Sequence, residues 1–180
     1  MLLVCIPTGF ASLIVNNPCL IAIDNKQVGN TTVPETYRFL CQLKSLTTGK
    51  PVEISGPKNE NEKPEYAVDG IVDIAKYWGT IPAPQWLKVD IQGEYMIDRV
   101  QVVPYFDGGR FYQYTVEFST DGKTWTQVVD ASKNTVPGTE KGYLHKFPPT
   151  KARYLKVNML RNSDNPAVHL VEIAAWEAGK

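Results

Sequence analysis

Histidine and cysteine are scarce in this 180-residue chain, which has two of the first and three of the second. A zinc enzyme or a histidine-based catalytic triad therefore has little material to draw on. The chain also lacks an excess of either charge, because 19 basic side chains balance 19 acidic ones. Nucleic acids and anionic membranes select proteins with a basic surplus, so we expect neither as a partner.

Long apolar runs are missing as well. None approaches the ~20 residues that a membrane span requires. The apolar amino terminus begins without Lys or Arg and is interrupted by Pro7 and Gly9, which does not fit a signal peptide. Only five of the first 44 residues are charged, against 33 of the remaining 136. We therefore predict an extension or a fragment of a neighbouring domain over residues 1–46, built of β-strands, and a main domain over residues 47–180.

The cysteines do not form a recognisable motif. Cys5, Cys19 and Cys41 include no CxxC pair and allow at most one disulfide. Buried free thiols, which pack as small apolar groups, are the favoured interpretation. The cysteines leave the cellular compartment open.

From Lys50 onward, hydrophobic residues recur with a period of two. Leu87, Val89 and Ile91 share one face of a predicted strand, and the segments 97–103, 112–118, 125–129, 153–160 and 168–176 follow the same pattern. Asp121-Gly122 supplies a tight turn between two of them. Six to eight short strands without a long helical period predict an all-β, antiparallel β-sandwich. Periodicity alone does not separate a jelly roll from an immunoglobulin-like order.

Several sequence blocks, taken in order, resemble the discoidin, or coagulation-factor 5/8 C-terminal, domain family. The blocks cover residues 49–177 and read KPV, AVDG, YWGT, QWLKVD, IDRV, YTVEFSTDGKTW, ARYLKV and HLVEI. The chain is most similar to the bacterial family 32 carbohydrate-binding modules of that family. This resemblance implies a discoidin-type, galactose-binding-domain-like jelly roll, no catalysis, and sugar capture by loops at one end.

A sugar site needs a flat aromatic ring and a few fixed polar groups in loops. The loop 104–112 has four aromatic residues, an aspartate and an arginine, and the resemblance implies an arginine and an aromatic residue in this loop. Strand-end core aromatics and a solvated arginine are the alternative. The predicted carbohydrate-binding residues are Tyr77, Tyr105, Phe106, Asp107, Arg110, Tyr112, Asn162 and Asn165.

Four further features bear on this prediction. Gly79 stands where sugar-binding relatives often carry a histidine. His169 falls on the apolar face of a strand, so we expect a hydrogen-bonded core residue. His145 alternates with Leu144, and we expect it to face solvent. Asn162, Asp164 and Asn165 are common turn-forming residues, which leaves a purely structural role open for them.

An acidic loop, Asp69-Gly70-Ile71-Val72-Asp73, can curl oxygen atoms around a hard cation. The resemblance implies a structural calcium ion here. Its expected ligands are Asp69, Glu172 and the carbonyl groups of Tyr66, Ile71 and Val171. The threonine that relatives carry after the glycine is absent, so Asp73 or a carbonyl group replaces its oxygen. Alternatively, Asp69 caps a turn and Glu172 pairs with a lysine.

The motifs HExxH and GxSxG and the phosphate-binding loop are absent from the sequence. We expect a non-catalytic carbohydrate-binding module, not an enzyme, that binds a glycan or polysaccharide. By resemblance it belongs to a larger protein that is secreted or lies at the cell surface and carries an appended catalytic domain. The alternative is an adhesion or phospholipid-binding discoidin domain.

Overall fold

The structure is a computed structural model of the chain, and it describes residues 45–179. The predicted states of Cys5, Cys19 and Cys41 and the strands predicted before residue 44 lie outside the described residues. Ser45 and Leu46, which the sequence assigned to the extension, already bind the main domain: the Leu46 N–H donates to the carbonyl oxygen of Ala175 at 2.9 Å.

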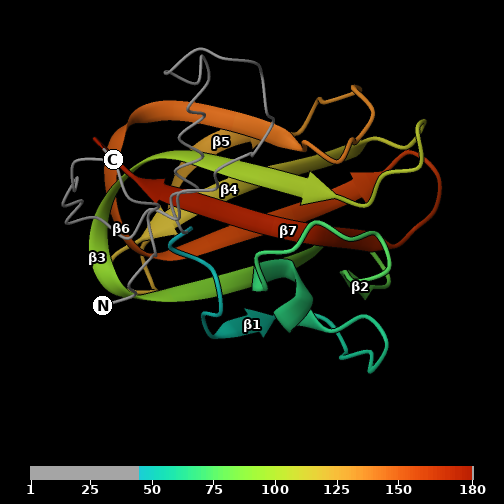
Figure 1. The fold of residues 1–180 in the computed structure, drawn as a ribbon, viewed down its shortest axis with the longest axis horizontal. Coiled ribbons are helices and arrows are strands. Elements are labelled where there is room, and N and C mark those ends of the chain that lie inside the picture. Colours follow the sequence, from blue (N-terminus) through green and yellow to red (C-terminus); the bar gives the residue numbers. More distant parts are fainter. Residues whose placement is uncertain (1–44, 180) are drawn as a thin grey trace, which may run out of the picture. The chain divides into compact units, whose positions relative to one another are not determined.

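Seven strands and one short 3₁₀ helix make up the described domain (Figure 1). They are β1 (Val52–Ile54), η1 (Pro64–Val68), β2 (Trp78–Thr80), β3 (Gln85–Pro104), β4 (Tyr112–Ser119), β5 (Thr126–Ala131), β6 (Tyr143–Asn162) and β7 (Val168–Glu177). The strands pair antiparallel in the order β2-β7-β3-β6-β4-β5, with β1 also on β3. The predicted antiparallel β architecture is confirmed.

The sandwich arises because β3 and β6 are long and bend. Residues 86–91 and 97–103, predicted as separate strands, are the two halves of β3. The pairing of β3 with β6 shifts register between Asp90 and Tyr95. At this bend Gln92 has φ 61°, a left-handed backbone conformation that residues other than glycine rarely adopt. The first half of β3 pairs with β1 and the second half with β7, so one hydrogen-bonded sheet folds over into two layers (Figure 1).

The core follows the predicted alternation. Tyr112, Tyr114, Val116 and Phe118 on β4 are at most 1% exposed. They meet the inward residues of β3 and β6, namely Leu87, Val89, Ile91, Leu155, Val157 and Met159, which are also at most 1% exposed. Each such side chain contributes about 1.5–3 kcal/mol when it leaves water. This packing fixes the loops at the ends of the sandwich.

Strand β7 is buried on both faces from Val168 to Ala175. Its first residues pair with β2 along one edge, and the turn after Ser45 covers more of that edge. The Thr47 hydroxyl donates to the carbonyl oxygen of Ile173 at 2.7 Å. Covering the edge removes unpaired backbone groups that would otherwise recruit another strand.

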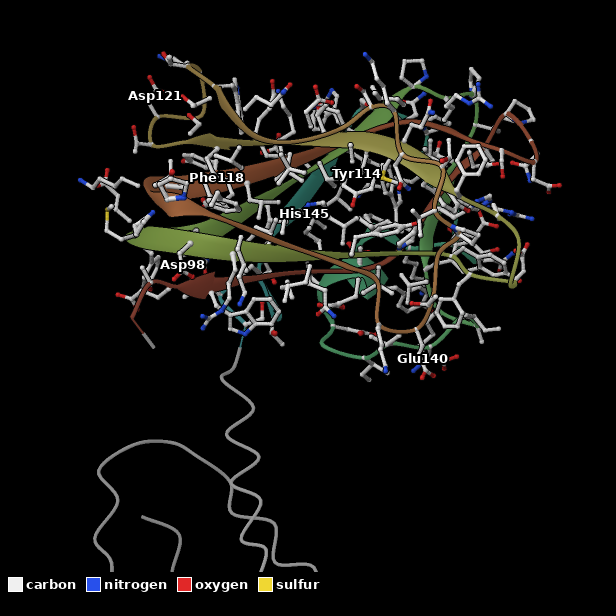
Figure 2. All side chains as sticks on the ribbon, turned by 90° about the horizontal axis from the view of Figure 1, so that it is seen from above. Asp98, Tyr114, Phe118, Asp121, Glu140 and His145 are labelled. Carbon is white, nitrogen blue, oxygen red and sulfur yellow. The ribbon has the colours of Figure 1, made fainter. Side chains whose placement is uncertain are left out.

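The prediction for His145 is wrong. Its side chain is half-buried between the layers, and its Nε2 lies 2.7 Å from the Tyr114 hydroxyl (Figure 2). The sequence argument placed Leu144 inside, but Leu144 is 55% exposed. Tyr143, His145 and Phe147 are the inward set because Tyr143 and Phe147 pack on the core as larger apolar groups. Burial lowers the pKa of His145 below its ordinary value.

Within residues 45–179, no helix has both the length and the apolar character needed to cross a membrane.

Candidate functional site

Loops from distant parts of the chain meet at the end of the sandwich that lies on the right in Figure 1. They are the β3–β4 loop (105–111), the β6–β7 loop (163–167) and the segment that leads into β2. Two hydrogen bonds lock the first two loops together: the Phe111 N–H donates to the Ser163 hydroxyl at 3.1 Å, and the Ser163 N–H donates to the Phe111 carbonyl at 3.0 Å. The loops therefore form a fixed surface.

Arg110 is the centre of this surface. Its Nη2 lies 2.8 Å from a carboxylate oxygen of Asp164 and 3.2 Å from one of Asp107. Its guanidinium carbon lies 5.2 Å from the centre of the Tyr105 ring, within the range of a cation–π contact. The side chain is only 15% exposed. The sequence predicted a loop arginine beside an aromatic ring, and the structure places the two in contact.

Asp107 is positioned by the backbone of its own loop. Its Oδ1 accepts hydrogen bonds from the N–H groups of Arg110 at 2.9 Å and Gly109 at 3.2 Å. These bonds, the Arg110 N–H first, lower the pKa of Asp107 below its ordinary value, against the opposing effect of burial. The carboxylate is thus ionised and fixed beside the guanidinium.

Aromatic rings form the floor beneath Arg110. Tyr77 contacts Tyr105 edge-to-face with ring centres 5.4 Å apart, and it contacts His169 at the same distance. His169 is buried, and its Nδ1 lies 2.8 Å from the Tyr112 hydroxyl. Burial and the charge of Arg110 lower the pKa of His169, so the ring is neutral near pH 7. The prediction of a hydrogen-bonded core histidine is confirmed.

Glu62 is a member of the surface that sequence reasoning missed. The Tyr77 hydroxyl donates to its Oε1 at 3.0 Å, and the Asn59 amide donates to its Oε2 at 3.0 Å. A Cβ atom at Gly79 would collide with this carboxylate. Gly79 therefore leaves room for Glu62. The glycine was the available signal, but no spacing pattern pointed to a residue 17 positions earlier.

Two predicted sugar contacts do not reach the surface. Tyr112 is fully buried, because it belongs to the inward face of β4 and supports His169 from below. Asn162 is 4% exposed, and its side chain holds the β6–β7 loop by bonding Ala167 and the backbone of Asp164 and Asn165. Both residues support the site from beneath its surface.

The other predicted residues are accessible to different degrees. Tyr77, Tyr105 and Phe106 are half-buried, whereas Asp107 and Asn165 are exposed. The Oδ1 of Asn165 accepts the Ala167 N–H at 3.0 Å, which is a turn-forming contact.

The predicted calcium ligands separate into two groups. Glu172 on β7 is 4% exposed, and its Oε2 accepts the Gly70 N–H at 3.2 Å, whereas its buried Oε1 has no hydrogen-bond partner. Burial, together with the nearby charge of Asp69, raises the pKa of Glu172 to about 8. Tyr66, Ile71 and Val171 lie in the same two chain segments as Asp69 and Glu172, and they can offer carbonyl groups.

Asp73 does not join this pair. Its Oδ1 accepts the Ala75 N–H at 2.9 Å and closes a local turn, as Asp69 does with the Ile71 N–H at 2.8 Å. Across residues 45–179 no cluster of three or more His, Cys, Asp or Glu side chains is placed to hold a metal ion. A cation here would depend on Asp69, Glu172 and carbonyl oxygens.

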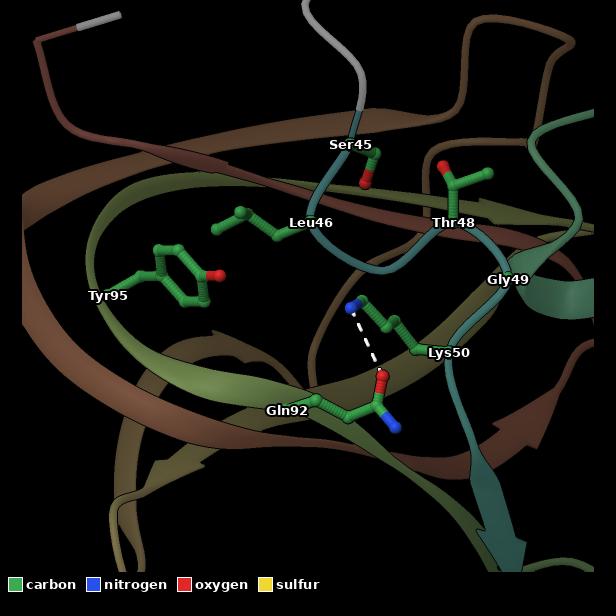
Figure 3. Close-up of a pocket in the computed structure, with 7 residues that line it drawn as sticks. All are labelled: Ser45, Leu46, Thr48, Gly49, Lys50, Gln92 and Tyr95. Atoms are coloured by element: carbon green, nitrogen blue, oxygen red, sulfur yellow. Dashed lines mark hydrogen bonds between the residues drawn. The ribbon is translucent and has the colours of Figure 1, made fainter.

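A pocket of about 300 Å³ lies at the opposite end of the sandwich (Figure 3). It is bordered by the turn after Ser45 and by the β3 bend, and Lys50 Nζ bonds Gln92 Oε1 across it at 3.2 Å. The residues that line the pocket in Figure 3 are Ser45, Leu46, Thr48, Gly49, Lys50, Gln92 and Tyr95. No sequence motif indicated this pocket.

Comparison with known proteins gives a consistent answer. No curated protein matches the chain. Among solved structures, the family 32 module of AlyQ, in complex with 4,5-unsaturated mannuronic acid, is 22% identical with a TM-score of 0.62, over 71% of this chain and 95% of that one. A pectin-binding carbohydrate-binding module is 24% identical with a TM-score of 0.59, over 72% and 91% of the two chains.

A family 89 glycoside hydrolase from Clostridium perfringens is 22% identical with a TM-score of 0.65, over 74% of this chain but only 14% of the hydrolase. These likenesses establish the fold. The family model for the F5/8 type C domain matches residues 51–173, which is most of the described domain. The chain therefore belongs to the F5/8 type C domain family.

Proposed function

We propose that this domain binds glycans at the loop-end surface, which we define as Glu62, Tyr77, Tyr105, Asp107, Arg110 and Asp164. The observation that carries the proposal is Arg110, held against the Tyr105 ring and between two carboxylates. Sugars present apolar ring faces and outward hydroxyl groups, so aromatic rings beside fixed donors and acceptors suit them. The structural neighbours named as carbohydrate-binding modules support the same conclusion.

The contact is expected to be weak. A shallow surface buries little area and must displace water from hydroxyl groups, which corresponds to dissociation constants on the order of 0.1–1 mM. Modules of this affinity act by keeping an attached partner near its polymer. We propose that the domain is a non-catalytic part of a larger, secreted or cell-surface, carbohydrate-active protein. The family 89 glycoside hydrolase supports this arrangement, because the match to this chain covers only 14% of the hydrolase.

We also propose a structural calcium ion between Asp69 and Glu172. The residues fit, because the buried Glu172 Oε1 lacks a hydrogen-bond donor and a second carboxylate lies nearby. Hard cations accept carboxylate and carbonyl oxygens together. A bound ion would offset the cost of ionising the buried Glu172 carboxyl and tie β7 to the Asp69–Gly70 turn.

Phospholipid binding is the second candidate. Four aliphatic side chains are exposed by 42–56%, namely Ile71, Val72, Ile74 and Ile81. Membrane-binding loops also need basic residues around their apolar tips. Lys76 is the basic residue within this stretch, and Tyr105, Phe106 and Phe111 are half-buried instead of projecting. The glycan proposal is better supported.

A glycan array tests the proposal with a matched pair of variants. Arg153 also stacks on a tyrosine, at 5.0 Å from Tyr154, and also pairs with an aspartate, Asp90. Arg110→Ala should abolish detectable binding, because charge-assisted hydrogen bonds contribute about 1.5–3 kcal/mol each. Arg153→Ala should bind like the parent. Equal binding by parent and Arg110→Ala, or pelleting of the parent with phosphatidylserine vesicles and no glycan bound, would overturn the proposal.

A further inference from the structure

The loop-end surface carries an excess of negative charge. Arg110 lies between Asp107 and Asp164, and Glu62 adds a third carboxylate beside Tyr77. These three carboxylates and one guanidinium give a formal charge of −2, whereas the whole chain is neutral. The excess is local to this end of the sandwich.

Four other basic side chains form ion pairs away from this surface. Lys88, Lys151, Lys156 and Arg153 pair with Glu53, Glu94, Glu117 and Asp90 respectively. Lys58, Lys63, Lys76 and Arg161 are near the surface residues in sequence, and all four side chains are exposed. His169 lies at the floor of the surface. Besides burial, three charged side chains affect its pKa, namely Arg110, Glu62 and Asp164. The charged side chains that act on the floor of the surface are therefore its own residues.

Arg110 is poorly placed to receive an acidic ligand. Its Nη2 already contacts two aspartates, and its side chain is 15% exposed. A uronic acid carboxylate would have to displace an aspartate and would still face Glu62. The acidic groups are the more accessible ones, since the side chains of Asp164 and Asp107 are 60% and 37% exposed. A ligand cation can reach them directly.

Glu62 adds rigidity to this arrangement. The carboxylate is half-buried, and both of its oxygens accept hydrogen bonds from neighbouring side chains. A charge fixed before binding loses little entropy when a ligand arrives, and partial burial strengthens its field.

We propose that the loop-end surface selects glycans that carry free, protonated amino groups over N-acetylated and uronic acid glycans. This inference rests on the proposed function, because it names the ligand class of the same surface. Ammonium groups on a sugar ring would contact the aspartates and Glu62 while the ring lies against Tyr77 or Tyr105. Neutral sugars would keep only the ring contact and the hydrogen bonds from Arg110.

Calorimetric titration of the full 180-residue chain tests this selection. Three probes are compared: a fully deacetylated glucosamine hexamer, the N-acetylglucosamine hexamer of the same linkage, and a galacturonic acid hexamer. The measurement is made at a pH at which the amino groups are protonated. We expect the glucosamine hexamer to bind at least about fivefold more tightly than its acetylated counterpart, and the acidic hexamer most weakly.

Two variants locate the effect. Glu62→Gln should reduce the ratio between glucosamine and N-acetylglucosamine affinities. Glu53→Gln on β1 changes the net charge equally but removes a carboxylate that pairs with Lys88, so it should leave the ratio unchanged. Melting curves verify that both variants fold. High salt should shrink the ratio as well.

The outcomes separate this inference from the proposed function. A parent that binds any array glycan but shows no preference for the glucosamine hexamer, or a ratio reduced equally by both variants, overturns the charge selection and leaves glycan binding intact. A parent that binds neither the three hexamers nor any array glycan overturns the proposed function.

Discussion

Arg110 and Arg153 occupy similar local environments at opposite ends of the sandwich. Each guanidinium lies about 5 Å from a tyrosine ring and pairs with an aspartate. Arg153 pairs with Asp90 just before the β3 bend, and its side chain is 43% exposed against 15% for Arg110. The difference lies in what surrounds them: Arg110 has two locked loops and an aromatic floor. An arginine–tyrosine contact alone therefore does not define the site.

Gly142 gives a prediction at the scale of a single residue. Its φ is 56°, and a Cβ atom there would lie 2.5 Å from the carbonyl oxygen of Val102. Gly142→Ala should lower the free energy of unfolding by about 2–4 kcal/mol, because left-handed strain and a backbone clash add. Gly109→Ala, at a position with open space, should change it by less than about 0.5 kcal/mol. Urea unfolding compares them, and equal stabilities would contradict the described turn.

At the scale of elements, the strands were predictable and the bends were not. The alternation of apolar side chains identified the inward faces of β4 and the second half of β6, because period two follows directly from strand geometry. The β3 bend was hidden, since Gln92 rather than glycine takes the left-handed conformation. The alternation also assigned His145 to the wrong face, because Tyr143 and Phe147 pack against the core and Leu144 does not.

The candidate site was predictable only in part, because some of its residues meet only in the folded chain. The β3–β4 loop is contiguous, so its aromatic and charged residues were visible together. Glu62 and Asp164 join it only through tertiary packing. Tyr112 was counted in both the loop 104–112 and the strand predicted over 112–118; as the first residue of β4 it follows the alternation inward.

Strand β6 carries a pH prediction. Burial lowers the pKa of His145 below 6.5, so the unfolded state binds more protons than the folded state as the pH falls. Stability from this group is complete above the unfolded pKa and is lost below it. Below about pH 6.5, the free energy of unfolding should fall as the pH falls, with a contribution from this residue of at most about 1.4 kcal/mol per pH unit.

His145→Gln isolates that contribution, since glutamine does not titrate. We expect a shallower pH slope in the variant. The remaining slope combines His169, whose pKa is also lowered, with Glu172, whose raised pKa acts in the opposite direction. Urea unfolding at several pH values gives both slopes. Identical slopes for parent and variant would show that His145 is not buried as described.

At the scale of the whole molecule, the proposed calcium ion should contribute to stability. An ion that binds only the folded state stabilises it by about 2.7 kcal/mol at a free concentration of 100 times Kd. Chelation should therefore lower the melting temperature, and Glu172→Gln should abolish the response to calcium. A melting curve unchanged by chelator, on protein shown by mass spectrometry to have lost its metal, would contradict the site.

The sandwich has two distinct ends, and the central claim assigns glycan binding to one of them. The loop-end surface lies on the right in Figure 1. The pocket of Figure 3 lies at the β3 bend, at the other end of the strands. Both ends have backbone amides that report on ligand contact. A single titration can therefore compare them.

The most direct test is an NMR titration of the ¹⁵N-labelled chain with the glycan that binds best on the array. The account predicts amide shifts in residues 105–111 and 163–165 and around Glu62 and Tyr77, with no change at Lys50, Gln92 or Tyr95. Shifts confined to the β3-bend end, or no shifts at saturating glycan, would contradict it.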